Sequence, residues 1–292
     1  MCLVGEETSG MGNSSALCLR FDLDTFSSRH AYTDDVGWGA YAYLPRLLRL
    51  AQVGGARYQF CACGQGLREY PLEIEAIRAE GHAIDSHLYS HRVTLLDELA
   101  RVVEELLLTE LSFRDQRVPW TGLGATGMYA NGIDACGEVQ GLLVERGYQW
   151  CSTRYVKDSD IADMQPYWLD EHLLEIPCVG MSDRNYFYDR QAPPSGLIEI
   201  LVRYLQESVA KDLVCAICLH PGVLARFDPD CDVVAALVER AGEFGVPLVT
   251  MDQICQWRTA RREVERFEAG QRPFGPACWQ DCPEIGKAPL GP

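Results

Sequence analysis

Short apolar segments rich in β-forming residues alternate along this chain with longer segments whose apolar residues recur at helical spacing. The predicted strands are residues 16–24, 56–62, 82–87, 148–153, 173–179, 213–221 and 246–252. The predicted helices are residues 38–52, 71–81, 94–111, 134–147, 196–211, 233–245 and 254–269. Alternation of strands and helices over short connections favours a parallel sheet, and seven or eight such units favour a closed α/β barrel.

One barrel domain accounts for most of the chain. The 292 residues are enough for a single barrel, which takes roughly 200–250 residues. No internal repeat or linker divides the sequence, whereas residues 1–13 and 270–292 are poor in periodicity and rich in glycine and proline. We therefore expect a single domain over residues 14–269 with a tail at each end.

The charge of the chain limits its partners. The formal net charge is −16 at pH 7, and nucleic-acid or anionic-membrane surfaces need a cluster of basic residues. No apolar run reaches the roughly 18–20 residues of a membrane span. The first residues lack the basic and apolar regions of a secretory signal. We therefore expect a cytoplasmic protein without a nucleic-acid partner, and the sequence leaves a homo-oligomer open.

Thirteen cysteines are many for this length. Their count is odd, and several lie in apolar runs, among them Cys18, Cys215 and Cys218. We interpret them as buried free thiols in a reducing compartment. Because the chain has no paired Cys-x-x-Cys motifs at zinc-finger spacing, these cysteines are weak evidence for a metal site.

Acidic and imidazole side chains stand at the ends of three predicted strands. The first strand ends in Asp22-Leu23-Asp24, and strand alternation sends the two carboxylates to the same side. The third strand ends at His87, with His91 one turn further, and a later strand ends at His220. In a parallel barrel the carboxyl ends of the strands converge, so we expect these side chains to share one site.

One carboxylate and two imidazoles form a three-ligand set that leaves a coordination position open for water, as catalytic zinc sites do. A second carboxylate beside that water can act as general base, and a histidine across the pocket can protonate the leaving group. Taken singly, Asp-x-Asp is more often a turn or helix cap, and His-x-x-x-His a surface feature. Their occurrence together at three strand ends favours the hydrolytic site.

The sequence resembles the NodB-homology polysaccharide deacetylases, which form carbohydrate esterase family four, from about residue 16 to about residue 255. Its most specific match is GHAIDSHLYSH, residues 81–91, which follows the second family motif with its Gly-His and two Ser-His pairs. The aspartate pair at 22–24 matches the first motif, Arg117-Val118-Pro119 the third and Leu219-His220 the fifth. The resemblance implies a single-domain α/β fold, a distorted (β/α)7 barrel.

The resemblance also implies roles for individual residues. Asp24, His87 and His91 would hold a divalent metal, most readily zinc, although such a set also accepts cobalt, nickel or manganese. Asp22 would be the catalytic base and His220 the general acid. Arg117 would orient the base, and a backbone N–H after Pro119 would help to bind the oxyanion.

Two features depart from the common family pattern. The first motif is Asp-x-Asp, as in the branch with peptidoglycan deacetylase relatives, cyclic-imide hydrolases and lipid-sugar deformylases, rather than two adjacent aspartates. The fourth motif is blurred, because MSDRNYFYD (181–189) offers aspartates but no tryptophan. The residues that we expect to bind substrate are Pro119, Trp120, Asp183 and Tyr186. Gly122, Gly124, Gly127 and Gly132 predict a glycine-rich loop, which lacks the sequence of a phosphate cradle.

These observations favour a metal-dependent amide hydrolase that removes an acyl group from an N-acylated sugar or glycan. The same site could instead open a cyclic amide or imide, or remove a formyl group from a lipid-linked amino sugar. A third alternative is a catalytically inactive barrel that only binds glycan. The complete set of a base opposite an acid argues against that alternative, because binding alone requires neither.

Overall fold

The structure is a computed structural model that describes residues 15–24 and 36–269. Both expected tails, 1–13 and 270–292, lie outside these residues. Contacts divide the chain into one unit that ends at Gln253 and a second that begins at Ile254. The first unit carries the sheet, and the second contains most of the last helix, α10 (Met251–Glu268). The domain limits 14 and 269 stay a prediction.

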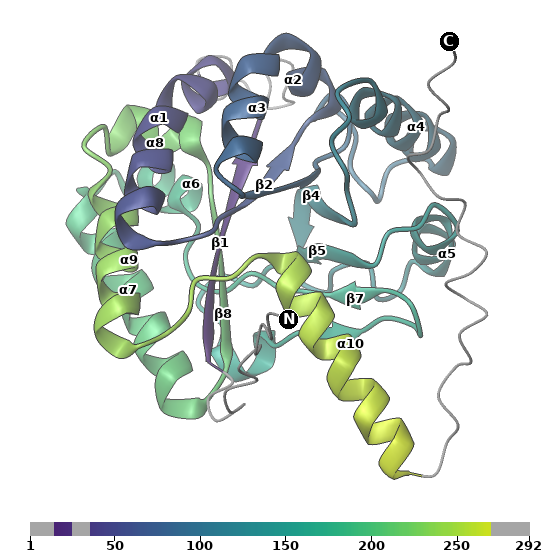
Figure 1. Cartoon of the computed structure of the whole chain (residues 1–292). Helices are drawn as coiled ribbons and strands as arrows, with labels where there is room; N and C mark the ends of the chain where they lie inside the picture. The colour runs from purple at the N-terminus through teal and green to yellow at the C-terminus, as the bar shows by residue number, and fades with distance from the viewer. Residues whose placement is uncertain (1–14, 25–35, 270–292) are drawn as a thin grey trace, which may run out of the picture. The chain divides into compact units, whose positions relative to one another are not determined.

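A single curved sheet forms the centre of the first unit (Figure 1). Its strands are β1 (Ala16–Leu23), β2 (Gln59–Ala62), β3 (Ala83–Ser86), β4 (Gly122–Tyr129), β5 (Trp150–Arg154), β6 (Tyr167–Trp168), β7 (Leu174–Glu175) and β8 (Val214–Leu219). Their order is β6-β7-β5-β4-β3-β2-β1-β8, and all neighbours pair in parallel except β6 and β7.

The sheet curls back toward itself beyond β7. The Val179 N–H donates to the Ala216 carbonyl of β8 over 2.7 Å, so the segment after β7 meets the strand at the opposite end of the sheet. Seven parallel strands thus surround one interior, with the short β6 attached outside. This arrangement confirms the predicted distorted (β/α)7 barrel of the NodB type.

Helices lie around the sheet (Figure 1). They are α1 (Val36–Gly54), α2 (Gly64–Glu69), α3 (Pro71–Ala79), α4 (Leu99–Asp115), α5 (Gly137–Glu145), α6 (Asp183–Asn185), α7 (Pro194–Lys211), α8 (Pro221–Phe227) and α9 (Asp232–Phe244). A 3₁₀ turn, η1 (Ile161–Met164), and a π turn, η2 (Tyr186–Arg190), complete the connections. None of the described helices is long and apolar enough to cross a membrane.

The alternation along β1 separates two environments. Leu17, Leu19 and Phe21 belong to the apolar cluster under the helices. Arg20 and Asp22 point the other way, into the barrel, where Arg20 reaches β4 and β5. Every residue of β1 is buried, so the polar side chains on its inner face must find partners inside the barrel.

The structure corrects two predictions of secondary structure. The expected glycine-rich loop begins with an eight-residue strand, β4, because its glycines make room for large neighbours. A Cβ on Gly122 would lie 1.8 Å from the ring of Trp150. The expected strand 246–252 is reduced to an isolated bridge between Leu248 and Leu17, and α10 begins already at Met251.

Candidate active site

Asp24, His87 and His91 converge beyond the carboxyl ends of β1 and β3. All three are buried. The Nε2 atoms of His87 and His91 lie 3.3 Å and 3.2 Å from Asp24 Oδ1, and the three potential ligand atoms are all within 4.8 Å of one another. His91 reaches this point from a left-handed backbone conformation with φ of 57°, which is uncommon for a residue other than glycine.

The donor atoms of this group fit a divalent metal. Although the two nitrogens are near Asp24 Oδ1, that oxygen and His87 Nε2 have no hydrogen-bond partner among the described residues. The other ring nitrogen of His87, Nδ1, lies 2.7 Å from the Gly124 carbonyl. A carbonyl can only accept, so Nδ1 carries a proton, which leaves Nε2, on the side that faces Asp24, as the ring nitrogen that could bind a metal, as in metal-binding histidines.

Burial would raise the pKa of Asp24, but the adjacent His91 and His87 hold the pKa well below its usual value. Asp24 is therefore a carboxylate at neutral pH. One anionic oxygen and two imidazoles in a buried cluster match the ligands that zinc takes in catalytic sites with three protein ligands.

Asp22 is held by Arg20, two residues earlier on the same inner face of β1. Arg20 Nε and Nη2 donate to the two carboxylate oxygens over 2.6 Å and 2.8 Å. Burial would raise the pKa of Asp22, but the guanidinium of Arg20 and the nearby His87 lower it below the usual value. Asp22 is thus an ionised carboxylate in a fixed orientation.

Arg20 is itself completely buried, and the rest of the barrel satisfies it. Its Nη1 donates to the carbonyl and hydroxyl of Ser152, each over 3.0 Å, and Nη2 donates to the Ala125 carbonyl over 3.1 Å. Gly124 provides the space, because a Cβ there would lie 2.7 Å from the guanidinium carbon. The guanidinium of Arg20 therefore holds the Asp22 carboxylate in one orientation.

His220 stands opposite, immediately after β8, and Asp183 holds it. The Nδ1 atom of His220 lies 2.7 Å from Asp183 Oδ1, and the His220 N–H donates to Asp183 Oδ2 over 2.7 Å. Burial would lower the pKa of His220, but the charge and hydrogen bond of Asp183 raise it to about 9. The imidazolium that results has Nε2 4.0 Å from Asp22 Oδ2.

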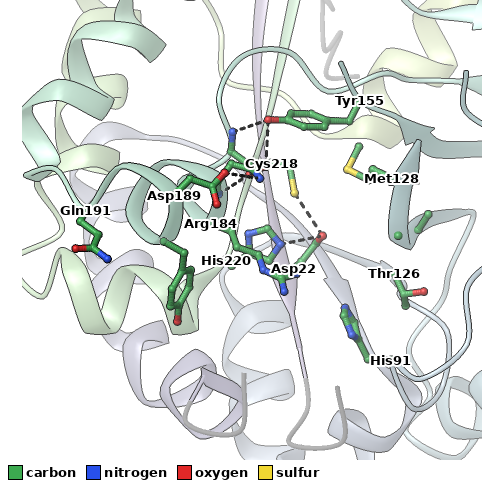
Figure 2. Close-up of a pocket in the computed structure, with 15 residues that line it drawn as sticks. Asp22, His91, Thr126, Met128, Tyr155, Arg184, Asp189, Gln191, Cys218 and His220 are labelled. Carbon is green, nitrogen blue, oxygen red and sulfur yellow. Dashed lines mark hydrogen bonds and ion pairs between the residues drawn. The ribbon is translucent and has the colours of Figure 1, made fainter. Parts of the chain in front are cut away.

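A pocket of about 640 Å³ opens over Asp22, His91 and His220 (Figure 2). Its walls come from the end of β4, the residues after β5, and the segment of α6 and η2. The other lining residues are Ala125, Thr126, Gly127, Met128, Tyr155, Ser182, Arg184, Asn185, Tyr188, Asp189, Gln191 and Cys218.

The structure brings together five of the predicted site residues, namely Asp22, Asp24, His87, His91 and His220. It does not bring Arg117 to them. Arg117 is exposed and lies between the end of α4 and the start of β4. In a parallel sheet the amino end of β4 is opposite to the carboxyl end of β1, so Arg117 cannot orient Asp22; Arg20 holds that position instead.

Three of the four expected substrate contacts also lie elsewhere. Pro119 and Trp120 belong to the same connection as Arg117, and the Trp120 ring packs edge-on against Phe113 with centroids 5.6 Å apart. Tyr186 is buried, and its hydroxyl donates to the Pro193 carbonyl over 3.0 Å.

The fourth expected contact, Asp183, lies at the site as the hydrogen-bond partner of His220. It is fully buried and contacts His220 rather than lining the pocket. The sequence prediction missed Arg20, although a signal was present: Arg20 and Asp22 are two residues apart on one strand, so they must share a face.

Comparison with known proteins supports the fold. No protein-family model matches the sequence, and no curated protein matches it. A solved structure described as a polysaccharide deacetylase from Mycobacterium smegmatis is 22% identical, with a TM-score of 0.68 over 86% of this chain and 92% of that one. A second, from Pseudomonas aeruginosa PAO1, is 17% identical, with the same TM-score and coverage.

An allantoinase, Puue, is 18% identical, with a TM-score of 0.65 over 84% of this chain and 90% of that one. Its coverage, like that of the two deacetylase structures, extends over most of both chains. The chain therefore has the fold of the polysaccharide deacetylases, as the motifs indicated.

Proposed function

We propose that the protein is a metal-dependent amide hydrolase that removes an acyl group, normally acetyl, from an N-acylated sugar or glycan. The observation that carries this proposal is a three-ligand cluster of Asp24, His87 and His91 beside two opposed polar pairs. One pair is a carboxylate fixed by arginine, and the other is an imidazole fixed by a carboxylate. A protein that only binds glycan needs neither a positioned base nor a positioned acid.

Zinc, or cobalt, nickel or manganese in its place, would supply Lewis acidity here by lowering the pKa of water and polarising the amide carbonyl. Asp24, His87 and His91 would hold the ion. The remaining chemistry belongs to the side chains around it.

Asp22 acts as the general base. Its pKa lies below the usual range, so it is ionised at neutral pH and ready to accept a proton. Its Oδ2 is 3.7 Å from His87 Nε2, which places the base at the edge of the ligand cluster. The two hydrogen bonds from Arg20 restrict the rotation of the carboxylate, and this orientation favours proton transfer in one direction.

His220 acts as the general acid. With a pKa of about 9 it is protonated at neutral pH, and Asp183 keeps its Nε2–H directed toward Asp22 and the pocket. Donation of this proton lets the nitrogen leave as an amine. Without it, the leaving group would be an amide anion, which is too basic to depart.

The pocket supports a substrate of sugar size. Its volume of about 640 Å³ lies within the range of small-ligand sites, roughly 300–1,000 Å³. Tyr155 and Tyr188 line it beside the polar side chains of Ser182 and Asn185. Aromatic rings suit the apolar face of a sugar, and the amide and hydroxyl groups suit its hydroxyls.

Hydrolysis by the zinc-loaded protein tests this proposal. The substrates are N-acetylglucosamine oligomers, a formamido sugar and a cyclic imide, and chelator-stripped protein is the control. We expect release of acetate from the oligomers that disappears with the metal. Turnover of the imide alone would reject the deacetylase assignment, and no turnover of any substrate would favour the binding-only barrel.

A further inference from the structure

Cys218 is a buried thiol with no part in the proposed hydrolysis, yet it lines the same pocket. It lies on the inner face of β8, two residues before His220. Its Sγ donates to Asp22 Oδ2 over 3.3 Å. Figure 2 shows Cys218 and His220 both directed toward the Asp22 carboxylate.

The three side chains have the spacing of metal ligands. One potential ligand atom from each of Asp22, Cys218 and His220 lies within 4.8 Å of the others, with 3.3 Å between Cys218 Sγ and Asp22 Oδ2 and 4.0 Å between that oxygen and His220 Nε2. Tetrahedral zinc with bonds of about 2.0–2.3 Å separates its ligands by about 3.3–3.6 Å. The Cys218 Sγ–Asp22 Oδ2 distance of 3.3 Å already has this length, and His220 Nε2, 4.0 Å from Asp22 Oδ2, needs to move closer by only about 0.7 Å to that oxygen.

The surroundings favour a soft metal ion. Asp183 occupies Nδ1 of His220, which leaves Nε2 as the ligand and repeats the carboxylate–histidine pairing of many metal sites. The thioether of Met128 lines the same pocket. Thiolate and thioether ligands select soft or borderline ions, whereas the cluster of Asp24, His87 and His91 contains no sulfur.

We propose that Asp22, Cys218 and His220 form a second metal site, which binds thiophilic divalent ions such as cadmium or zinc and inhibits the enzyme. On binding, the Cys218 thiol and the Nε2–H of the His220 imidazolium each release a proton to solvent, and the ion bonds to the thiolate, to the Asp22 carboxylate and to the deprotonated Nε2 of His220. The inhibitory part rests on the proposed function, because the ion occupies the base and the acid together. The metal site itself does not.

Cadmium-113 NMR of the full chain tests the site. With two equivalents of cadmium we expect one resonance typical of oxygen and nitrogen ligands and one displaced by a sulfur ligand. Cys218→Ser should remove only the second resonance. The matched control is Cys215→Ser, since Cys215 lies on the same strand but faces the helix layer and is fully buried. The remaining cysteines are the same in the unaltered chain and in both variants. A resonance that disappears in Cys218→Ser but not in Cys215→Ser is therefore assigned to Cys218.

An unchanged sulfur-displaced resonance in Cys218→Ser would overturn the site. Should that variant not fold, His220→Gln removes the imidazole ligand and keeps the thiol. The resonance must then shift or vanish, and an unchanged one again rejects the site.

Inhibition by excess cadmium or zinc is the second measurement, with each variant compared with its own uninhibited rate. We expect the half-inhibitory concentration to rise by more than about tenfold in Cys218→Ser and to stay unchanged in Cys215→Ser. Equal inhibition of both variants would reject the inhibitory role. If no substrate is hydrolysed at all, the proposed function fails, and the NMR result still decides whether the site exists.

Discussion

At the scale of single residues, the site depends on pairs in which one side chain fixes another. Arg20 fixes the Asp22 carboxylate through two hydrogen bonds, and Asp183 fixes His220 through two more. Each pair leaves one group in a defined protonation state despite burial. Asp22 remains ionised and His220 remains protonated, which is the combination that a base and an acid need at neutral pH.

Arg20→Lys tests the first pair. Lysine keeps the positive charge but cannot form the bidentate hydrogen bond of arginine, so the Asp22 carboxylate is no longer held in one orientation. We expect kcat to fall on the order of 100-fold with KM little changed and zinc content retained. Arg117→Lys is the matched control and should leave kcat unchanged. A larger loss in Arg117→Lys than in Arg20→Lys would restore the role that the sequence motif assigned to Arg117.

The pH dependence of kcat/KM tests the second pair. The pKa of His220 is raised to about 9, so the acid is present below this pH and is lost as the pH rises through it. We expect activity to decline above about pH 9, and Asp183→Asn to move this decline toward the ordinary histidine value of about 6.5. A decline at the same pH in both proteins would show that Asp183 does not set the state of His220.

At the scale of secondary structure, β4 shows where sequence reasoning succeeded and where it failed. Most strands and helices follow from periodicity, because apolar residues on one face must meet a core. The glycines of β4 resemble a loop in sequence, and their purpose is visible only when Trp150 and Arg20 are placed beside them. Packing between distant strands, not local preference, makes this segment a strand.

Gly124→Ala tests that explanation. The added Cβ would lie 2.5 Å from Cys61 Sγ and 2.7 Å from the Arg20 guanidinium, so we expect the free energy of unfolding to fall by about 1–3 kcal/mol. Gly141→Ala is the control, since nothing lies within 4 Å of its Cβ in α5, and it should raise stability by about 0.5–1 kcal/mol. Urea unfolding measures both changes, and equal effects would contradict the packing argument.

At the scale of the barrel unit that ends at Gln253, the parallel strands separate two polar clusters. The candidate site lies at the carboxyl ends, and a second network lies where β3 and β4 approach β5. There Asp85 accepts hydrogen bonds from Gln59 Nε2 and the N–H groups of Thr121 and Gly122, over 2.7–2.8 Å. Asp252 accepts from Trp150 Nε1 over 2.7 Å and from the Thr121 hydroxyl.

This second network makes stability depend on pH. Burial, followed by the charge of Asp252, raises the pKa of Asp85 to about 8. An aspartate with a raised pKa stabilises the fold below its unfolded pKa of about 3.9, and this contribution is lost as the pH rises toward 8. We expect Asp252→Asn, which keeps the acceptor oxygen, to reduce the fall in unfolding free energy between pH 5 and pH 8. An identical fall in both proteins, measured by urea unfolding, would contradict this coupling.

The sequence predicted the fold class of this unit and the cluster at the strand ends because both follow from local rules. Strand alternation orients Asp22 and Asp24, and parallel strands bring His87, His91 and His220 to the same edge. The arginine partner and the pocket walls were mispredicted. They depend on which segments meet across the barrel, and a motif read along the chain contains no such information.

Titration of zinc into chelator-stripped protein shows whether Asp24, His87 and His91 jointly hold a divalent ion. We predict that the tighter of two zinc equivalents binds to this cluster in the unaltered chain and persists in Asp22→Asn, whose hydrolysis is abolished, whereas zinc at the site of Asp22, Cys218 and His220 binds more weakly. Loss of a residue that hydrogen-bonds to a metal ligand typically lowers metal affinity by about 10–100-fold. His87→Ala and His91→Ala remove a ligand itself, so we expect zinc affinity to fall by more than that. Tight binding that survives in both histidine variants would show that these three residues do not hold the ion.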